Sequence, residues 1–136
     1  MLFQKIIIDM LITLSESNSS VNALWLYGSR AKGNAHLESD FDLAVMFDRK
    51  IRDPLDNRLR PELLAEEWRK TLNLPPSKLS ILDVESAPLP IAFNAINGEL
   101  LYCRNNGIRM SKESVIMSKI ELDLQYHLTH FENEQA

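Results

Sequence analysis

The sequence predicts a mixed β-sheet with flanking helices, which is an α/β (α+β) fold. Apolar runs of strand length alternate with longer segments whose apolar residues recur at helical spacing, and turn-forming residues separate the two kinds of segment. The chain has 136 residues, of which 45% are hydrophobic and 25% charged, as in an ordinary globular protein. This length suits one compact domain over residues 1–136. We expect its elements in the order α β β α β α β α.

The N-terminal half contains the first four of these elements. Apolar residues at helical spacing predict a helix over residues 2–15, and the apolar run at 21–27 predicts a buried strand that ends in a glycine turn. The run at 40–47 predicts a second strand, buried except at its start. Residues 48–56 are charged and contain a proline, so we expect a loop there, followed by a helix over 57–72.

The C-terminal half contains the other four. The apolar run at 78–84 predicts a third strand, and residues 88–97 predict a short helix with Gly98 as its C-terminal cap. A fourth, shorter strand is expected over 99–103. A serine with N-cap character opens the last predicted helix, which covers residues 111–131.

Charge and cysteine content narrow the functional classes. The formal net charge of −4 argues against general nucleic-acid binding, which normally needs a basic face. Cys103 is the only cysteine, so no intramolecular disulfide or thiolate metal cage can form, which favours a reducing, cytoplasmic location. Lys5 and Asp9 interrupt the first apolar run, which therefore reads as a helix and not a signal peptide, and no run approaches membrane-spanning length. We expect neither a membrane partner nor direct nucleic-acid binding.

Two carboxylates open the second predicted strand. In a strand, residues i and i+2 point to the same face, so Asp40 and Asp42 project side by side while Phe41 turns toward the core. Two carboxylates this close repel each other, and a divalent cation relieves that repulsion. Mg²⁺ prefers one or two carboxylates together with water and substrate phosphate. Asp40 and Asp42 are therefore candidate catalytic residues and magnesium ligands.

A glycine turn follows the first predicted strand. Gly28 permits a sharp bend and close backbone approach, and Ser29 offers a hydroxyl and a backbone N–H near an expected helix N-terminus. Such termini bind phosphate through free N–H groups and the helix dipole. Arg30 and Lys32 can add positive charge. These four residues form a candidate nucleotide-binding set, which would share a pocket with the carboxylates if the two strands are neighbours.

A third carboxylate is expected, because two-metal phosphoryl chemistry usually draws one from a separate strand. Asp83, near the end of the apolar third strand, is the candidate. Each feature alone has a structural alternative: Gly-Ser is a common turn, Asp-x-Asp a common strand end, and Asp83 a plausible turn former. Their combination, with Gly-Ser after one apolar strand and Asp-x-Asp at the start of the next, favours a catalytic site.

The spacing of these residues resembles the signature of the DNA polymerase β-like nucleotidyltransferase superfamily, which is Gly-Ser, ten residues, then Asp-x-Asp. Residues 30–39 separate Ser29 from Asp40, which matches that spacing in full. The resemblance covers nearly the whole chain, from the first helix to the strand at 99–103. It implies the polymerase β-like nucleotidyltransferase fold.

The short length is similar to that of the minimal nucleotidyltransferases. Some of these are antitoxins paired with a helical HEPN ribonuclease toxin, as in the MntA–HepT type. The resemblance implies that they use ATP and Mg²⁺ to place AMP on a tyrosine of the toxin. We expect two Mg²⁺ ions in this chain, one that lowers the pKa of the attacking hydroxyl and one that neutralises charge on the leaving phosphates. The resemblance also implies roles in this chain: Gly28 and Ser29 hold the triphosphate, Asp40 and Asp42 hold metal, and Asp83 supplies the third carboxylate.

We expect either that another protein binds the acceptor of the nucleotidyl group in trans, or that a homodimer completes the site. Nucleotidyltransferases that modify small molecules usually carry a further domain for the acceptor, and this length leaves no room for one. Helix 111–131 offers an apolar stripe that either docks a partner or simply covers the sheet. The stripe consists of Val115, Ile116, Ile120, Leu124, Leu128 and Phe131.

Two alternative functions stay open beside protein adenylylation. The chain would be a non-catalytic antitoxin if it neutralised its partner by masking the partner's active site. It would be a small-molecule or RNA-end nucleotidyltransferase if the acceptor were not a protein. The intact Ser29, Asp40 and Asp42 argue against loss of catalysis, and the acidic balance argues against the last alternative.

Overall fold

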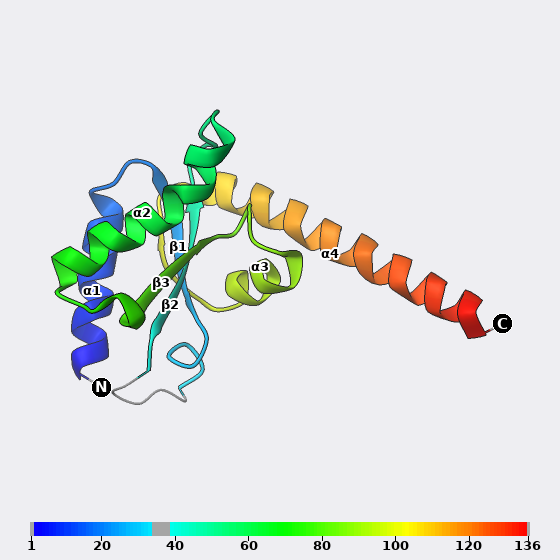
Figure 1. Ribbon diagram of the computed structural model, residues 1–136, viewed down its shortest axis with the longest axis horizontal. Coiled ribbons are helices and arrows are strands. Elements are labelled where there is room, and N and C mark those ends of the chain that lie inside the picture. The colour runs from blue at the N-terminus through cyan, green and yellow to red at the C-terminus, as the bar shows by residue number, and fades with distance from the viewer. Residues whose placement is uncertain (1, 34–38, 136) are drawn as a thin grey trace.

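The computed structural model describes residues 2–33 and 39–135 of the chain. Figure 1 shows a sheet with helices on both sides and one long helix that projects from the body. The predicted fold class and order of elements are confirmed, with one added 3₁₀ turn. In chain order the elements are α1 (Leu2–Glu16), β1 (Val21–Tyr27), β2 (Phe41–Phe47), α2 (Pro54–Leu72), η1 (Pro76–Lys78), β3 (Leu79–Asp83), α3 (Leu89–Ile96), β4 (Glu99–Cys103) and α4 (Asn106–Gln135).

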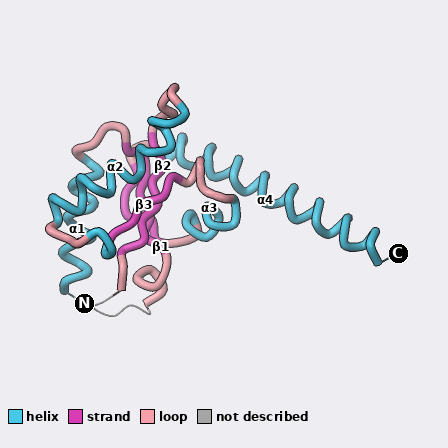
Figure 2. Tube along the Cα trace, in the orientation of Figure 1, coloured by secondary structure: helices cyan, strands magenta, loops and turns pink. Residues whose placement is uncertain are grey.

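The four strands form one mixed sheet in the order β3-β2-β1-β4. Figure 2 shows the strands in magenta between the helices. β1 pairs antiparallel with β2 and with β4, whereas β2 and β3 run parallel. The antiparallel pairing sets Tyr27, at the end of β1, opposite Asp42, near the start of β2. The turn that follows β1 is therefore brought to the end of the sheet where β2 begins.

Helices cover both faces of this sheet. α1 and α2 lie over one face, where the larger apolar core includes Leu11, Phe41 and Trp68 (Figure 1). α3 and the first turns of α4 lie over the other face, where a smaller core includes Trp25 and Ile116. Alternate residues of β1 and β2 contribute to opposite cores, as expected for strands buried on both faces.

Helix α2 begins earlier than its apolar periodicity indicates. The Asp53 side chain accepts hydrogen bonds from the backbone N–H groups of Leu55 and Asp56, at 2.9 and 3.0 Å. Pro54 occupies the first turn, where its missing N–H is not needed. The predicted loop over 48–56 was therefore wrong at its end, because this cap and proline together start a helix.

Helix α4 also begins earlier than predicted. The Asn105 side chain accepts a hydrogen bond from the Ile108 backbone N–H at 3.0 Å, and the helix starts at Asn106. Ser111, the predicted cap, lies inside the helix. The sequence prediction missed five residues because the first turn carries little apolar periodicity.

The C-terminal half of α4 extends away from the rest of the molecule (Figure 1). Ile116 is 5% exposed where the helix packs on the body, whereas four apolar side chains farther along the helix are more than half exposed. They are Leu122, Leu124, Tyr126 and Leu128. The helix thus covers the sheet only at its start. No helix within the described ranges combines the length and apolarity that crossing a membrane requires.

Candidate active site

The turn after β1 and the start of β2 meet at one point. Gly28 directly follows Tyr27, which pairs with Asp42 across the antiparallel ladder. Gly28 has a φ of +74°, and a Cβ atom built on it would lie 2.5 Å from Oδ2 of Asp42. Only glycine combines this backbone conformation with this close approach. The structure thus brings the Gly-Ser turn and the Asp-x-Asp strand start together.

The Asp42 carboxylate is half-buried between β1 and β3. On the β3 side, the Ser80 hydroxyl donates a hydrogen bond to Oδ1 of Asp42 at 3.2 Å. Burial raises the pKa of Asp42, the Ser80 hydrogen bond lowers it, and the nearby charge of Asp40 raises it. Asp40 is exposed and directly precedes β2. A cation bound between the two carboxylates would favour the ionised form of both.

The carboxylates of Asp40 and Asp42 are the part of the site that suits a metal ion. Among residues 2–33 and 39–135, no group of three or more His, Cys, Asp or Glu side chains is placed to hold one. Two adjacent carboxylates with an open side fit Mg²⁺, which completes its coordination with water and phosphate oxygens. The donor set at Asp40 and Asp42 therefore fits one hard cation that arrives with a phosphate ligand.

The turn that follows Gly28 does not begin a helix over residues 29–33, although a helix N-terminus was expected near Ser29. Residues 29–33 form hydrogen-bonded turns rather than a helix, and the Lys32 N–H donates to the Gly28 carbonyl at 3.2 Å. Ser29 is half-buried inside this turn, directly after Gly28. The helix N-terminus expected here is replaced by one turn of chain, and the rest of the predicted loop, residues 34–38, lies outside the described residues.

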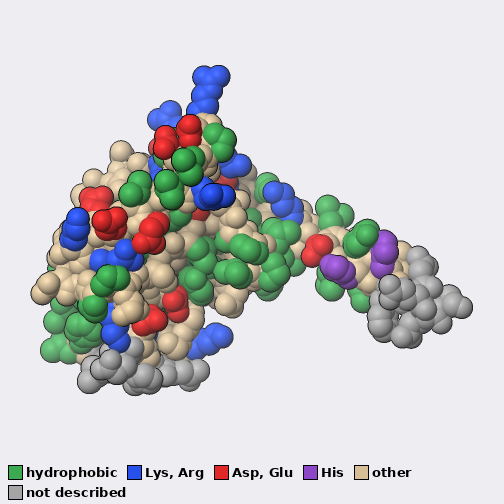
Figure 3. All heavy atoms as spheres, viewed as in Figure 1, with side chains coloured by type: hydrophobic (Ala, Val, Ile, Leu, Met, Phe, Trp, Pro, Cys, Tyr) green, Lys and Arg blue, Asp and Glu red, His purple; other side chains and the backbone are tan. Residues whose placement is uncertain are grey.

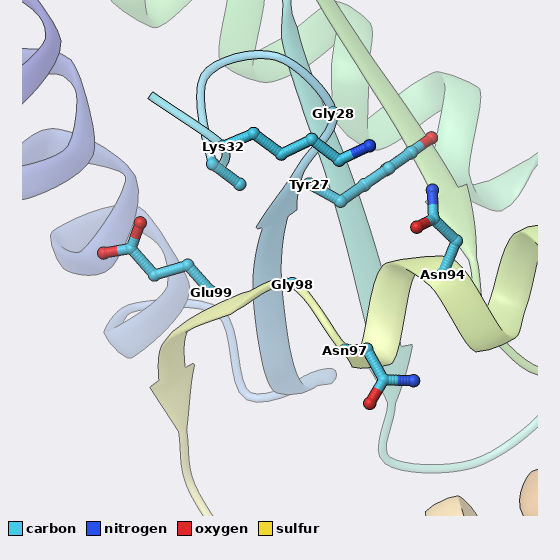
Figure 4. Close-up of a pocket in the computed structure, with 8 residues that line it drawn as sticks. Tyr27, Gly28, Lys32, Asn94, Asn97, Gly98 and Glu99 are labelled. Carbon is cyan, nitrogen blue, oxygen red and sulfur yellow. The ribbon is translucent and has the colours of Figure 1, made fainter. Parts of the chain in front are cut away.

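A cavity of about 350 Å³ opens beside this turn. Lys32 lines it together with Tyr27, Asn94 of α3 and Asn97, which directly follows α3. In Figure 4 the polar ends of Lys32, Tyr27 and Asn94 point to the same side of the cavity, whereas Glu99 points away from them. The two asparagines carried no sequence signal, because only the packing of α3 against β1 brings them here.

Gly98 also lines this cavity, and its role differs from the predicted helix cap. Asn97, not Gly98, is the C-terminal cap of α3. A Cβ atom at Gly98 would lie 2.5 Å from the Leu26 carbonyl oxygen and 3.1 Å from Cβ of Tyr27. The glycine therefore permits the chain between α3 and β4 to approach β1 closely.

Arg30 is not brought to this cavity. Its side chain is 3% exposed, and its Nε and Nη2 atoms donate to the Ser39 carbonyl at 3.0 and 2.8 Å. Nη1 donates to Oε1 of Gln4 in α1 at 3.0 Å, and the guanidinium lies 4.0 Å from the centroid of the Phe41 ring. The predicted nucleotide contact is therefore corrected to a structural role, which ties the turn to α1 and to the start of β2.

Asp83 is not brought to the two carboxylates either. The parallel register pairs Asp83 with Val45, three positions beyond the Asp42–Ser80 pair. An odd offset turns the side chain to the opposite face, toward α2. Asp83 accepts hydrogen bonds from the Glu85 N–H at 2.9 Å and the Ser86 hydroxyl at 3.3 Å, and burial raises its pKa. The structure thus supports the turn-forming alternative and corrects the expected third ligand.

The sequence from residue 9 to residue 107 matches the family model for polymerase β nucleotidyltransferases. This range contains the whole sheet and both parts of the Gly-Ser and Asp-x-Asp pattern. No curated protein matches the chain.

Solved structures share the fold at low sequence identity. A crystal structure of a toxin–antitoxin with AMP-PNP is 19% identical and has a TM-score of 0.69, with 95% of this chain and 98% of that chain covered. A structure of the tri-AMPylated Shewanella oneidensis HEPN toxin in complex with MNT antitoxin is 17% identical, with a TM-score of 0.63 and coverage of 98% and 99%. A crystal structure of the toxin–antitoxin MntA–HepT is 17% identical, with a TM-score of 0.58 and coverage of 89% and 87%.

At these identities the solved structures establish likeness of fold, and the family model adds the relationship in sequence. The match spans well over half of the chain and includes the glycine turn packed against Asp42. The chain therefore belongs to the polymerase β nucleotidyltransferase family.

Proposed function

We propose that this protein is a Mg²⁺-dependent nucleotidyltransferase that transfers AMP from ATP to a tyrosine hydroxyl of a HEPN-type ribonuclease toxin, and so acts as its antitoxin. The observation that carries the proposal is the approach of Gly28 to Asp42, where a single Cβ atom would overlap a carboxylate oxygen. A triphosphate held at the turn would therefore lie directly against the carboxylates that hold its metal ion.

Five residues have roles in this proposal. Gly28 and Ser29 would hold the triphosphate through the turn, and Lys32 would add positive charge from the wall of the cavity. Asp40 and Asp42 would hold Mg²⁺, which when bound neutralises negative charge on the phosphates. Because the cavity adjoins the turn, it is the natural place for the rest of the nucleotide or for the acceptor side chain.

The transfer itself is a substitution at phosphorus. The acceptor oxygen forms a bond to the α-phosphorus of ATP, and the bond from that phosphorus to the oxygen bridging the α and β positions breaks. Pyrophosphate leaves with that bridging oxygen, and the proton of the acceptor hydroxyl passes to solvent. The protein contributes positioning and electrostatic stabilisation of the developing charge.

The structural neighbours support the donor and the partner in this proposal. One of them contains AMP-PNP, an analogue of ATP, with a toxin–antitoxin. Another contains a HEPN toxin that carries AMP groups, in complex with an MNT antitoxin. Both cover nearly all of this chain.

Helix α4 is the proposed docking element for the partner. Hydrophobic side chains gather where α3 and α4 meet and recur along the projecting part of α4 (Figure 3). Leu122 and Tyr126 are 66% and 58% exposed there. Burying such side chains contributes roughly 1.5–3 kcal/mol each, so a partner on this helix would gain substantial binding energy. α3 also carries Asn94 of the cavity, so this surface adjoins the site.

The same helix supports a second candidate function. A protein that neutralised its partner by binding alone would need this exposed apolar surface and no chemistry. The two candidates differ in whether the carboxylates are needed. A variant with both Asp40→Asn and Asp42→Asn separates them, because α4 is distant in sequence from both substitutions and keeps its surface.

The test is co-expression of the chain with the protein encoded beside it, followed by intact mass measurement of both proteins. We expect a mass gain of one or more AMP units on the partner with the wild-type chain and none with the double variant. An equal gain with both would contradict the proposed site. Neutralisation of the partner by the double variant, with no mass gain in either case, would favour the binding function.

A further inference from the structure

We infer that Ser80 takes the position from which a third carboxylate would complete a two-metal site, and that the protein consequently binds one metal ion with its nucleotide. This inference rests on the proposed function and assigns Ser80 as a positioning residue for Asp42. β3 runs parallel beside β2, and its register sets Ser80 opposite Asp42. The side chain that meets the metal-binding strand from β3 is therefore a neutral hydroxyl.

The contacts of Asp42 show what this hydroxyl does. Ser80 Oγ donates to Oδ1 of Asp42 at 3.2 Å, while Oδ2 of the same carboxylate faces Gly28. The carboxylate is thus held from both sides, by a hydrogen bond and by close backbone approach. Partners that hydrogen-bond to a ligating carboxylate orient it and contribute to metal affinity. Ser80 is exposed, so its place in the site does not depend on burial in the core.

The count of one metal ion follows from the available oxygen ligands. Two ions about 3.5–4 Å apart need carboxylates that bridge them and further ligands for each ion. Asp40 and Asp42 are the carboxylates that the described chain brings to this point, and Asp83 faces the opposite side of the sheet. Two carboxylates and a triphosphate suit a single octahedral Mg²⁺ ion, whereas a neutral hydroxyl is a poor substitute ligand for a second one.

Mn²⁺ is a suitable probe, because it occupies oxygen-ligand sites and can be counted directly. The full chain is dialysed to equilibrium against Mn²⁺ with saturating AMP-PNP, and bound Mn²⁺ and bound nucleotide are counted per chain. We expect one Mn²⁺ for the wild type and two for Ser80→Asp, which supplies the third carboxylate. Ser80→Asn is the matched control for Ser80→Asp. Asparagine has the shape of aspartate and a side-chain oxygen but no negative charge, so this variant should retain one Mn²⁺.

Two milder variants test the positioning role. Ser80→Ala removes the hydrogen bond and should weaken Mn²⁺ binding about 10- to 100-fold, as is typical when a partner of a metal ligand is lost. Ser80→Thr keeps the hydroxyl and should restore wild-type affinity. Unfolding by urea identifies any variant that has lost its fold. Because Ser80 is exposed, we expect the Asn, Ala and Thr variants to unfold near the wild-type midpoint. Ser80→Asp places a further carboxylate beside Asp42, so its unfolding is measured with Mn²⁺ and AMP-PNP present.

Several outcomes would overturn the inference. Two Mn²⁺ ions in the wild type would show that the site is already complete, and one ion in a folded, nucleotide-bound Ser80→Asp variant would show that position 80 does not face a second metal site. No binding of Mn²⁺ or AMP-PNP by the wild type would defeat this inference and the proposed function together. One bound ion without any AMP transfer to the partner would leave the inference standing and remove the proposed function.

Discussion

The paired strands β2 and β3 carry an aspartate near each end of their ladder, and the surroundings of the two differ completely. Near the start of β2, Asp42 lies between Gly28 and Ser80, at the end of the sheet where β2 begins. At the end of β3, Asp83 lies beside Val45, 7% exposed, and is bonded to the turn that follows it. The two positions are about 10 Å apart along the strands and on opposite faces. An aspartate at a strand end therefore takes its role from its face and its neighbours.

The largest expected effect is a difference in AMP-transfer activity between substitutions of Asp42 and of Asp83. Asp42→Asn removes a proposed metal ligand, so AMP transfer should fall at least about 100-fold, as several kilocalories per mole of transition-state stabilisation are lost. Asp83→Asn is the matched control and should transfer AMP at the wild-type rate. Transfer of labelled AMP from ATP to the co-purified partner measures both. Equal losses would show that the two ends act together after all.

The glycine turn gives the next largest effect. Gly28→Ala places a Cβ atom against Asp42 and forces an alanine to adopt the positive φ of this position. The substitution should therefore lower both the affinity for AMP-PNP and the free energy of unfolding. Gly33 has a similar φ of +76°, and no atom of the described residues lies within 4 Å of a Cβ built on it. Gly33→Ala should therefore lose only the backbone contribution, about 1–2 kcal/mol.

Titration with AMP-PNP and urea unfolding of these two glycine variants distinguish backbone strain at positive φ from the contact of a Cβ atom with Asp42. If Gly28→Ala and Gly33→Ala changed AMP-PNP affinity equally, the close approach of Gly28 to Asp42 would have no part in binding.

The buried arginine gives an intermediate effect, on stability. Arg30→Met would remove the guanidinium hydrogen bonds to the Ser39 carbonyl and the Gln4 side chain and the stacking on Phe41, so the free energy of unfolding should fall by about 2–3 kcal/mol. Arg49, whose side chain is 87% exposed, is the control, and Arg49→Met should leave stability nearly unchanged. Urea unfolding measures both. A small loss in the free energy of unfolding of Arg30→Met would mean that the turn after β1 and the start of β2 do not depend on Arg30 for their stability.

The smallest expected effect is on the pH dependence of stability, through Asp83 at the end of β3. Burial raises the pKa of Asp83 above its usual value of 3.8, so the folded state binds this proton more tightly than the unfolded state does. The contribution of protonated Asp83 to the stability of the fold is complete below pH 3.8, and it is lost as the pH rises through the raised pKa of the folded state.

Asp83→Asn removes this titration. The variant should match the wild type in acid and gain slightly at neutral pH, as urea unfolding at several pH values would show. A relative loss of stability on going from acid to neutral pH would mean that the ionised carboxylate is the form that the fold stabilises.

Much of the fold was predictable because apolar periodicity reports local structure directly. The predicted strands at 21–27 and 99–103 coincide with β1 and β4. The starts of α2 and α4 were missed, because Asp53 and Asn105 set them through side-chain caps that lie outside the periodic pattern. The site was predictable in part for the same reason: Asp42 and Gly28 each sit at the end of an apolar run.

The sequence by itself determined the Gly28-Ser29 turn, the carboxylates at Asp40 and Asp42 and the family that their spacing marks, because i, i+2 geometry and turn chemistry are properties of the local backbone. Only the tertiary structure decided that Ser80, and not Asp83, meets Asp42. The register of β3 against β2 is fixed by packing on both faces, and an odd step in that register sends a side chain to the opposite side of the sheet.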